Sequence, residues 1–597
     1  MLSLAADEPK RNWLQAPNFM NFWQIFIRVF WWRPLPALGA LWWQLTRRRV
    51  RARNRLRAAG ASLPFAYKFW MRNVEQPQQL SAHSSSAPRS WESRPEFTVI
   101  VDARDCPVED LASSIQSVEQ QAYEEWDLVV VSSEPTESAL LPASPRRLSS
   151  PALAILESKG AYIVPLKAGD QLSTWALFHF AEALQSQHDA AILYGDEDEL
   201  DEKGVRRRPW FKPQWNEELF LARDYLSRAC AVRSASARAA ATEIQAGQDT
   251  WTLGLLLHVI ARDDGPVVHL PSIIAHVRDV DSQAPQAARV EAVAKSVLAR
   301  GGTAAPGPHG SVRVSWPLPD PSPLVSLLVP TRDKLELLRP CVESLLEKTT
   351  YENFELLVVD NGSVEPETLR YLHDLGRNEK VIRILPYPHA YNYSAINNHA
   401  ARDARGAFLC LLNNDTEVVS GDWLAEMMRH AVRPQVGAVG AKLLYADGSI
   451  QHAGVIVGIG DAAGHPHRNL PADDPGYFGH AHLTQFVSAV TGACLLVDKR
   501  KFLAVGGLDE EHLPIAYNDI DLCLKLERAG WRNVYVPHAV LIHHESKSRA
   551  KDHAPARINA YRRELEAFQQ RWGTKSFNDP LLNPNLDRSS ETFLIRF

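Results

Sequence analysis

The chain has few cysteines for its length, and none lies in a spacing typical of a metal site or a disulfide framework. Six cysteines are scattered over 597 residues without a CxxC pair. This pattern argues against both a zinc knuckle and a disulfide-stabilised secreted domain, and it indicates the reducing cytosol. The six are Cys106, Cys230, Cys341, Cys410, Cys494 and Cys523.

A clean membrane-spanning run and a cleavable signal peptide are also missing. Residues 22–45 are rich in Trp and Phe, but Arg28, Arg33 and two prolines interrupt them. Residues 1–60 hold eleven Lys and Arg against two acids, so this segment carries +9 and the rest of the chain −14. Aromatic rings followed by arginines favour anionic lipid headgroups, so we expect a cytoplasmic protein, peripheral at the inner face of the cytoplasmic membrane. The alternative is a helix packed on the protein's own body.

No GxGxxG turn follows the first strand of the second half of the chain, where PTRDKLE stands at residues 330–336. A dinucleotide-binding oxidoreductase needs that turn, so the sequence argues against this class. We also expect no nucleic-acid partner.

The composition predicts a soluble globular protein of two large units with extensions. Hydrophobic residues make up 45% of the chain and charged residues 23%, as in ordinary globular domains. The expected order is an aromatic and basic extension (1–75), a Ser-, Gln- and Pro-rich linker (76–95), a first α/β unit (96–300), a Gly- and Pro-rich linker (301–323), a second α/β unit (324–550), and a C-terminal helix and tail (551–597).

Both units begin with the same pattern. Residues 97–103 form an apolar strand, 111–121 space their apolar residues helically, and 126–133 form a second strand. The pattern restarts with strands over 325–333 and 354–363. Strand, helix and strand in this order predict a parallel α/β sheet, and the two halves look like an internal duplication.

Polar residues follow three strands of the second unit, where a parallel sheet binds its ligands. Thr331, Arg332 and Asp333 follow the first strand, Asp360, Asn361 and Gly362 the second, and Asn413, Asn414 and Asp415 the strand over 408–412. We expect the three turns to meet at one crevice.

Seven motifs of the second unit resemble inverting family 2 glycosyltransferases, in order and approximate spacing. They are PTRD, VVDNGS, NYSAINN, LLNNDTEV, TGACLLV, NDIDLCLKLERAGW and HHESKSR. The similarity covers about residues 324–572 and is greatest to bacterial O-antigen and rhamnan-type polysaccharide enzymes. It implies two tandem domains of the Rossmann-like, mainly parallel GT-A fold.

The resemblance implies a nucleoside-diphosphate sugar as donor. Asp360 resembles the family aspartate that hydrogen-bonds the nucleotide base, and the alternative is an Asp that only caps its turn. The other residues assigned to nucleotide binding are Pro330, Thr331, Arg332, Asp333, Asn361, Asn392 and Asn414.

Asn413, Asn414 and Asp415 stand where the family has its DxD motif, whose carboxylate coordinates Mg²⁺ or Mn²⁺ on the diphosphate. One carboxylate can suffice, because magnesium often takes its other ligands from phosphate and water. The Asn at position 413 departs from the motif. His543 and His544 match a family histidine that completes the metal shell, and we favour His543; a structural or merely exposed histidine is the alternative.

Asp519 stands at the start of an amphipathic helix and resembles the family's general base. The helix dipole favours its ionised form, and an ionised carboxylate can accept a proton. Asn518 is expected near the helix cap, and Asp521 supports the helix start or the acceptor side. The alternative is that both acids only stabilise the helix terminus.

Two further stretches are expected to contact sugars. Thr491, Gly492 and Ala493 resemble the small-residue segment that lets the donor sugar approach the backbone. The His-rich insert 451–482 has spacings that match no zinc pattern, so we interpret it as a mobile loop on the acceptor side.

The first unit resembles the same fold but departs from it at the metal motif. Lys167 places a cation there, followed by Ala168, Gly169 and Asp170. Possible substitutes for the missing groups are Asp196, Asp198, Asp249 and His276. We interpret the unit as degenerate, while a lysine that neutralises the diphosphate directly stays a possibility.

The sequence therefore predicts a metal-dependent, inverting hexosyl- or deoxyhexosyltransferase. Its acceptor would be a hydroxyl of a cell-surface polysaccharide or a lipid-linked glycan precursor. The alternative is a non-catalytic glycan-binding or scaffold protein built from degenerate transferase domains.

Overall fold

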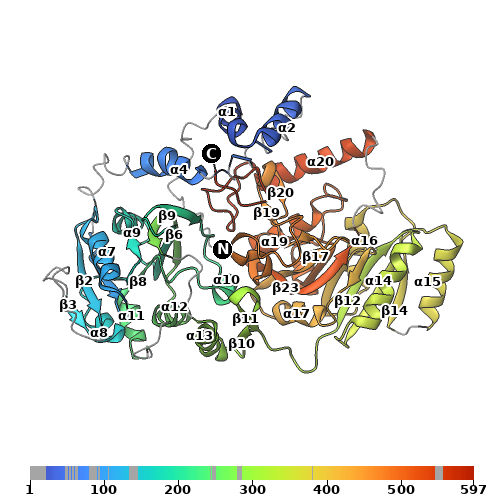
Figure 1. Ribbon diagram of the computed structural model, residues 1–597. Coiled ribbons are helices and arrows are strands. Elements are labelled where there is room, and N and C mark those ends of the chain that lie inside the picture. Colours follow the sequence, from blue (N-terminus) through green and yellow to red (C-terminus); the bar gives the residue numbers. More distant parts are fainter. Residues whose placement is uncertain are drawn as a thin grey trace. The chain divides into compact units, whose positions relative to one another are not determined.

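The computed structural model is shown in Figure 1. It describes residues 22–46, 52, 55–56, 59–60, 63, 65–79, 91, 94–104, 106–132, 146–242, 244, 250–278, 285–378, 381–544 and 555–596. The chain divides into two compact units. One consists of residues 1–93 with 585–590 and 594–597, and the other of residues 94–584 with 591–593.

The N-terminal unit contains the aromatic helices α1 (Phe22–Trp32) and α2 (Pro34–Leu45), followed by α4 (Ala66–Trp70) and η1 (Met71–Glu75). Val29, Ala37 and Ala40 form its small buried core together with Leu56. Other faces of α1 and α2 are apolar and exposed. Among the described residues, no helix is long and apolar enough to cross a membrane.

The larger unit holds two α/β sheets. The first has the strand order β3-β2-β1-β4-β8-β6-β9-β5, with β7 beside β6. Its strands are β1 (Phe97–Asp102), β2 (Trp126–Val131), β3 (Arg146–Leu148), β4 (Tyr162–Lys167), β5 (Gln171–Leu172), β6 (Ile192–Leu200), β7 (Arg206–Trp210), β8 (Cys230–Arg233) and β9 (Val267–Val277).

The second sheet has the order β14-β13-β12-β15-β22-β17-β23-β16, with β18 beside β17 and β21 beside β23. Its strands are β12 (Val325–Thr331), β13 (Phe354–Asp360), β14 (Ile382–Pro386), β15 (Phe408–Leu412), β16 (Thr416–Val418), β17 (Val436–Leu444), β18 (Ile450–His452), β21 (Gln485–Val487), β22 (Cys494–Asp498) and β23 (Arg532–His543). The short strands β19 (Ile456–Val457) and β20 (Ala463–Gly464) pair outside it.

The two sheets match strand for strand, which supports the expected duplication. In each, the first four strands pair in parallel, the fifth is antiparallel, and the sixth and seventh are again parallel to each other. Central strands are largely apolar, as strands covered on both faces are expected to be; FLCLL of β15, buried at every position, is an example. The expected α/β class with two tandem sheet domains is confirmed.

Helices cover both sheets. Those of the first half are α7 (Val108–Glu119), α8 (Pro151–Leu156), α9 (Ala176–Leu184), α10 (Glu217–Ala222), α11 (Ser234–Ala240), α12 (Trp251–Arg262) and α13 (Gln286–Leu298). Those of the second are α14 (Leu335–Lys348), α15 (Pro366–Asn378), α16 (Tyr393–Asp403), α17 (Trp423–Ala431), α18 (Lys499–Ala504), α19 (Asn518–Arg528) and α20 (Pro555–Trp572), with 3₁₀ turns η3 (Ile459–Asp461) and η4 (Tyr477–His482).

The segment 301–323, expected as a linker, instead contains an antiparallel hairpin of β10 (Thr303–Pro306) and β11 (Val312–Ser315), joined by η2 (Pro308–Gly310). Trp316, directly after it, is buried. Its Gly and Pro content reflects a tight connection between two packed halves rather than a flexible spacer.

The segment WFKPQWNEELF (210–220) packs against the second half. The Asn216 side chain pairs with the backbone of Phe486 in β21 through both its amide and its carbonyl group (2.8 and 3.0 Å). Trp210 stacks on Phe478 with ring centroids 4.5 Å apart. The segment therefore ties the two halves into one body.

A buried ion pair completes this contact. Arg433, at the end of α17, donates to the Glu218 carboxylate over 2.6 Å, and its guanidinium lies 4.2 Å from the ring centroid of Trp316. His430 Nδ1 is 3.6 Å from the other carboxylate oxygen. Burial and the Arg433 charge lower the pKa of His430 to about 3, so the imidazole is neutral and Arg433 is the cation that Glu218 depends on.

We predict that Arg433→Ala destabilises the larger unit, because it leaves the Glu218 carboxylate buried without a cation. Breaking a buried pair from one side costs about 3–5 kcal/mol. Urea unfolding followed by tryptophan fluorescence measures the loss. Lys295→Ala, which breaks the exposed pair with Glu291, is the control with little expected change. Adding Glu218→Gln to Arg433→Ala should restore part of the loss, and an Arg433→Ala protein as stable as wild type would contradict the prediction.

Candidate active site

The turn after β15 brings Asp415 to the end of β23. Thr416, the first residue of β16, pairs with His543, the last residue of β23. This register places His543 Nε2 3.1 Å from Asp415 Oδ1 and 3.2 Å from the side-chain amide nitrogen of Asn413. A carboxylate, an imidazole and an amide therefore converge at the carboxyl edge of the sheet.

Gln451 in β18 fixes the orientation of this histidine. Its Oε1 lies 2.7 Å from His543 Nδ1, so Nδ1 carries a proton and donates it to the amide oxygen. With Nδ1 protonated, a neutral imidazole presents a lone pair at Nε2. This lone pair can accept from the Asn413 amide or, beside the Asp415 carboxylate, bind a cation.

Asp415 is almost fully buried. Burial alone would raise the pKa of its carboxyl, but the hydrogen bond and charge of His543 outweigh it and hold the pKa below the ordinary value. The carboxylate is therefore ionised at neutral pH and available to a cation.

His544 points away from this cluster. Its Nε2 lies 2.8 Å from Glu417 Oε1, because consecutive residues of an extended chain project to opposite sides. Of the two histidines proposed as metal ligands, the structure brings His543 and not His544 to the Asp415 carboxylate.

The loops after β12 and β13 interlock at the same edge. Asp333 Oδ1 accepts from the backbone N–H groups of Val364 and Glu365 (2.7 and 2.8 Å). Asn361 donates from its side chain to the backbone oxygens of Tyr387 and His389. These predicted nucleotide-binding side chains thus shape the loops, and their own polar groups are largely occupied.

Thr331 and Asn414 join the first loop to the NND turn, since the Asn414 amide donates to Thr331 Oγ over 3.0 Å. Asp360 accepts from the Ser363 N–H with one oxygen, the turn-capping contact that the sequence left open as an alternative. Its second oxygen makes no hydrogen bond within the described part of the chain, and the residue is half-exposed. Arg332 is exposed, and Pro330 is half-buried beside it.

Asn392 lies farther along, at the start of α16. Its Oδ1 accepts from the Ala395 N–H and its amide donates to the Glu510 backbone oxygen, so it caps the helix and holds the loop that leads to α19.

Asp519 lies against the small-residue segment before β22. Its Oδ2 accepts the Gly492 N–H over 2.8 Å, and Tyr393 Oη donates to the Gly492 oxygen over 2.8 Å. A Cβ at position 492 would lie 3.2 Å from that hydroxyl and 3.4 Å from the Asp519 Cβ, so a larger residue would crowd both side chains and glycine suits this approach. Ala493 in turn accepts the Asn413 N–H, which joins this segment to the NND turn.

The helix α20 holds the turn that carries Asp519. Tyr517 caps α19 in the left-handed region with φ of 61°, a conformation strained for an aromatic residue. Its ring stacks on Phe568 at 4.9 Å, its hydroxyl lies 2.5 Å from that of Tyr561, and Glu564 accepts the N–H groups of residues 515 and 516. Asn518, expected near the cap, is the first residue of the helix and donates back to the Ile515 oxygen, while Tyr517 is the cap itself.

Asp521 is fully buried and structural. It accepts from Arg571 and Trp572 of α20 (2.8 and 3.0 Å) and lies 3.1 Å from Lys525 Nζ. This supports its expected role at the helix start. The contacts between α20 and α19 could not be predicted from the motifs, because Arg571 lies fifty positions from Asp521 in the chain.

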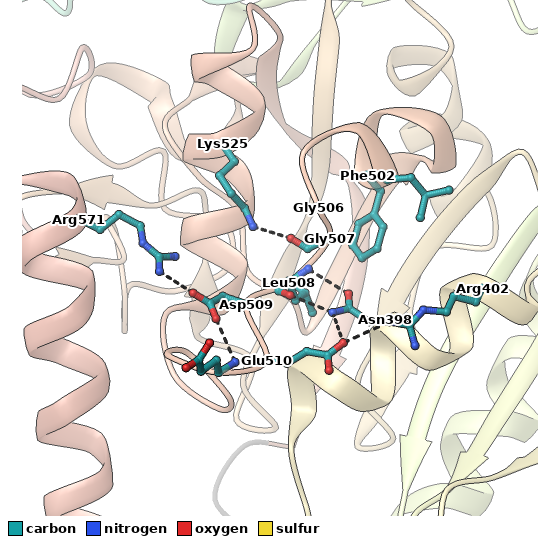
Figure 2. A pocket seen from close by; sticks show the side chains of 12 residues that line it. Asn398, Arg402, Phe502, Gly506, Gly507, Leu508, Asp509, Glu510, Lys525 and Arg571 are labelled. Carbon is teal, nitrogen blue, oxygen red and sulfur yellow. Dashed lines mark hydrogen bonds and ion pairs between the residues drawn. The ribbon is translucent and has the colours of Figure 1, made fainter.

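A cavity of about 510 Å³ adjoins the loop before α19 (Figure 2). Its charged walls are paired: Arg571 with Asp509, Arg402 with Glu510, and Glu510 also accepts from Asn398. None of the residues predicted for catalysis, metal or nucleotide binding lines it. We therefore place the donor at the sheet edge rather than in this cavity.

The His-rich insert is a packed wall and not a mobile loop, which corrects the expectation. His452, His467 and His480 are buried, and burial lowers the pKa of His480 to about 3 and that of His467 to about 4. Within the described residues, no group of three His, Cys, Asp or Glu side chains could hold a metal ion. Gln451, the first residue of this insert, orients His543, and this role was missed at the level of sequence.

The first half has different residues at the corresponding positions. Tyr162 pairs with Phe97 as Phe408 pairs with Val325. Counting forward seven residues from Tyr162 and from Phe408 brings Gly169 to the place of Asp415, and Lys167 to that of Asn413.

The histidine is also absent there. Glu197 pairs with Ala275 as Leu443 pairs with Leu541, and two residues on Val277 stands where His543 does. The expectation that His276 takes this position is wrong by one residue. His276 instead lies 2.6 Å from Asp198, and Asp196 pairs with His269, so neither acid substitutes for Asp415.

The base is replaced as well. The second residue of α19 is Asp519, and the second residue of the matching helix α12 is Thr252. Asp249, the other candidate, lies outside the described residues, as does the basic segment after His544.

Comparison with known proteins agrees with the geometry. Residues 326–456 match the model of the glycosyl transferase family 2. Over these residues the chain is similar to the glycosyl transferase family 2. The match starts inside β12 and ends at β19, so it includes the three loops and the Asp415 turn.

Two curated relatives match nearly the whole chain. An uncharacterised protein of Sinorhizobium fredii is 37% identical over 553 residues, which are 87% of this chain and 61% of that protein. The O-antigen biosynthesis protein RfbC of Myxococcus xanthus is 34% identical over 544 residues, 86% of this chain and 42% of that protein. The chain thus spans about half the length of these relatives. Among solved structures, the mannosyltransferase PcManGT of Pyrobaculum calidifontis, in complex with GDP-Man and Mn²⁺, is 16% identical over 45% of this chain and 70% of that one, with a TM-score of 0.32.

Proposed function

We propose that the second half is an inverting glycosyltransferase that moves a hexosyl or deoxyhexosyl group from a nucleoside-diphosphate sugar to a hydroxyl of a cell-surface polysaccharide or lipid-linked precursor. The observation that carries the proposal is the contact between Asp415 and His543 beside the segment on which Asp519 rests. The family 2 domain supports glycosyl transfer, and the relative named for O-antigen biosynthesis supports a polysaccharide acceptor.

The Asp519 carboxylate accepts the proton of the acceptor hydroxyl. The N–H groups of Gly492 and Ile520 donate to its two oxygens and hold the carboxylate in place at the N-terminus of α19, where a general base could face the acceptor hydroxyl. Attack by that hydroxyl on the face opposite the leaving diphosphate inverts the anomeric centre in one displacement.

Asp415 and His543 would hold Mg²⁺ or Mn²⁺. The donor set fits, because it offers an ionised carboxylate oxygen and an imidazole nitrogen oriented by Gln451, and the diphosphate and water supply the other ligands. When bound, the cation neutralises charge on the departing diphosphate.

The first test is Asp519→Asn, which keeps the shape of the side chain and removes its basicity. We expect transfer to fall by a factor of about 10²–10⁴, the usual contribution of a general base. Release of nucleoside diphosphate and labelling of acceptor measure the rate, with UDP-, GDP-, dTDP- and CMP-linked sugars as donors. Asp374→Asn, the same chemical change on an exposed helix, is the control. Thermal stabilisation by the preferred nucleotide should persist in both variants, and an Asp519→Asn enzyme with near wild-type turnover would sink the assignment.

A second test concerns metal binding. Gln451→Leu removes the acceptor that fixes the His543 tautomer, so Mn²⁺ affinity should fall by a factor of about 10–100. Electron paramagnetic resonance of free Mn²⁺, titrated with saturating nucleoside diphosphate, reports this without any turnover. His544→Ala is the control on the neighbouring position and should bind Mn²⁺ like wild type. Equal affinities for Gln451→Leu and wild type, or a loss confined to His544→Ala, would reject this metal site.

We further propose that the N-terminal helices attach the protein to the cytoplasmic membrane face. The side chains of Trp23, Trp31 and Trp42 are 53%, 80% and 57% exposed, a cost that an interfacial location removes. The arginine-rich residues that follow favour anionic lipid.

Flotation with vesicles of phosphatidylglycerol and phosphatidylethanolamine tests the attachment. Replacing Trp23, Trp31 and Trp42 together by Ala should release the protein from vesicles, and binding of wild type should weaken with salt. Leu298→Ala, which removes an exposed apolar side chain of the first half, should leave flotation unchanged. Wild-type protein that stays with the soluble fraction at low salt would refute membrane attachment.

A further inference from the structure

The first half keeps a cavity at the place where the second half has its proposed donor site. It measures about 220 Å³ and opens at the carboxyl ends of β1 and β4. Its walls come from the counterparts of the proposed catalytic segments, including Lys167, Ser227, Arg228 and Thr252.

Among the described residues, this cavity lacks the groups proposed for transfer in the second half. The strand registers put Gly169 and Val277 at the positions of the metal-binding pair, and Thr252 is the second residue of α12 as Asp519 is of α19. Arg228 occupies the position of Ala493, and its guanidinium binds Asp170 through two hydrogen bonds of 2.7 and 2.9 Å. The change is concerted, because metal ligands and base are replaced together while the cavity itself remains.

The charges of the walls balance. Three cations, Arg104, Lys167 and Arg228, face three carboxylates, Asp102, Glu197 and Asp224. Arg104 and Asp102 form a two-point ion pair, Glu197 pairs with the buried Lys212, and Arg228 pairs with Asp170 behind the wall. A diphosphate bound here would keep most of its charge uncompensated, since no group of three described His, Cys, Asp or Glu side chains could hold a metal ion and only Lys167 is a cation without a described partner.

Two polar atoms of the walls lack a partner among the residues that the structure describes. Ser227 Oγ and Trp210 Nε1 are buried and make no hydrogen bond there. Trp210 is 2% exposed and also stacks on Phe478 of the second half. Buried polar groups are normally paired, so these two atoms point to a neutral ligand that offers both donors and acceptors.

We propose that this cavity is a non-catalytic saccharide-binding site that holds a neutral sugar residue of the glycan. Ring hydroxyls both donate and accept, which suits the mixed carboxylates, guanidinium groups and hydroxyls of the walls. Indole rings of Trp210 and Trp251 supply apolar wall beside them. The identification of that glycan with the acceptor rests on the proposed function, whereas the site itself does not.

The test blocks the cavity in the full-length protein. Ser227→Phe fills it from the β8 side and Thr252→Phe from α12; Ser186→Phe, on an exposed turn of the same half, is the matched control. The probe is oligosaccharide released by mild acid from the surface polysaccharide of the producing cells, titrated calorimetrically. Both blocking variants should lose one binding site, with affinity there falling about tenfold or more, while the control binds like wild type. Unchanged melting temperatures establish folding, and two variants on different elements guard against misfolding of one.

A separate arm distinguishes the ligand classes. Lys167→Glu should leave oligosaccharide binding within about twofold, because a neutral ligand does not depend on that charge. UDP, GDP, dTDP and CMP should bind Ser227→Phe as they bind wild type. If Ser227→Phe or Lys167→Glu loses a nucleotide site, the proposal is overturned in favour of a phosphate ligand. If wild type does not bind the oligosaccharide, or if the blocking variants bind it like wild type, the proposal is overturned altogether. Failure of transfer in the second half shows only in the Asp519→Asn assay, so the two proposals fail independently.

Discussion

The pairing of β16 with β23 is the constraint on which the site depends. It sets Thr416 against His543, so that the residue just before β16 meets the last residue of β23. A shift of one residue would turn His543 to the other face of the strand and leave Asp415 with no imidazole. The buried apolar faces of the sheet hold this register, so stability of the core and geometry of the site are the same property.

The first half shows what the same register does without those side chains. Gln171 of β5 pairs with His276 as Glu417 of β16 pairs with Ile542, so the frame is kept to the residue. Yet Gly169 and Val277 occupy the two decisive places. The sheet therefore keeps its register without the carboxylate and the imidazole. A duplicated unit can lose these two side chains while its fold is preserved.

Sequence reasoning reached the strands, the duplication and the turn acids, because apolar runs ending in polar residues are local signals. It failed where the answer depended on distant contacts. A histidine lies one residue before the register position of His543 in β9, so His276 rather than Val277 looked like the counterpart of His543. Gln451 sits at the edge of a polar insert and reveals its role only by its 2.7 Å contact with a residue ninety-two positions away. The strained Tyr517 cap likewise depends on α20 and not on the local propensities that suggested Asn518.

The two crevices differ most clearly in their charged side chains. In the second half, Asp415 is buried beside a histidine and keeps an ionised carboxylate for a cation, and such a site gains from an anionic ligand that brings oxygen atoms to that cation. In the first half, Arg228 stands at the position of Ala493 with a permanent charge and pairs with Asp170. An arginine paired in this way cannot exchange ligands as a metal ion does. Under the two proposals made above, a preformed site of balanced charge suits a ligand that is held and released, so that binding would belong to the first half of the chain and chemistry to the second.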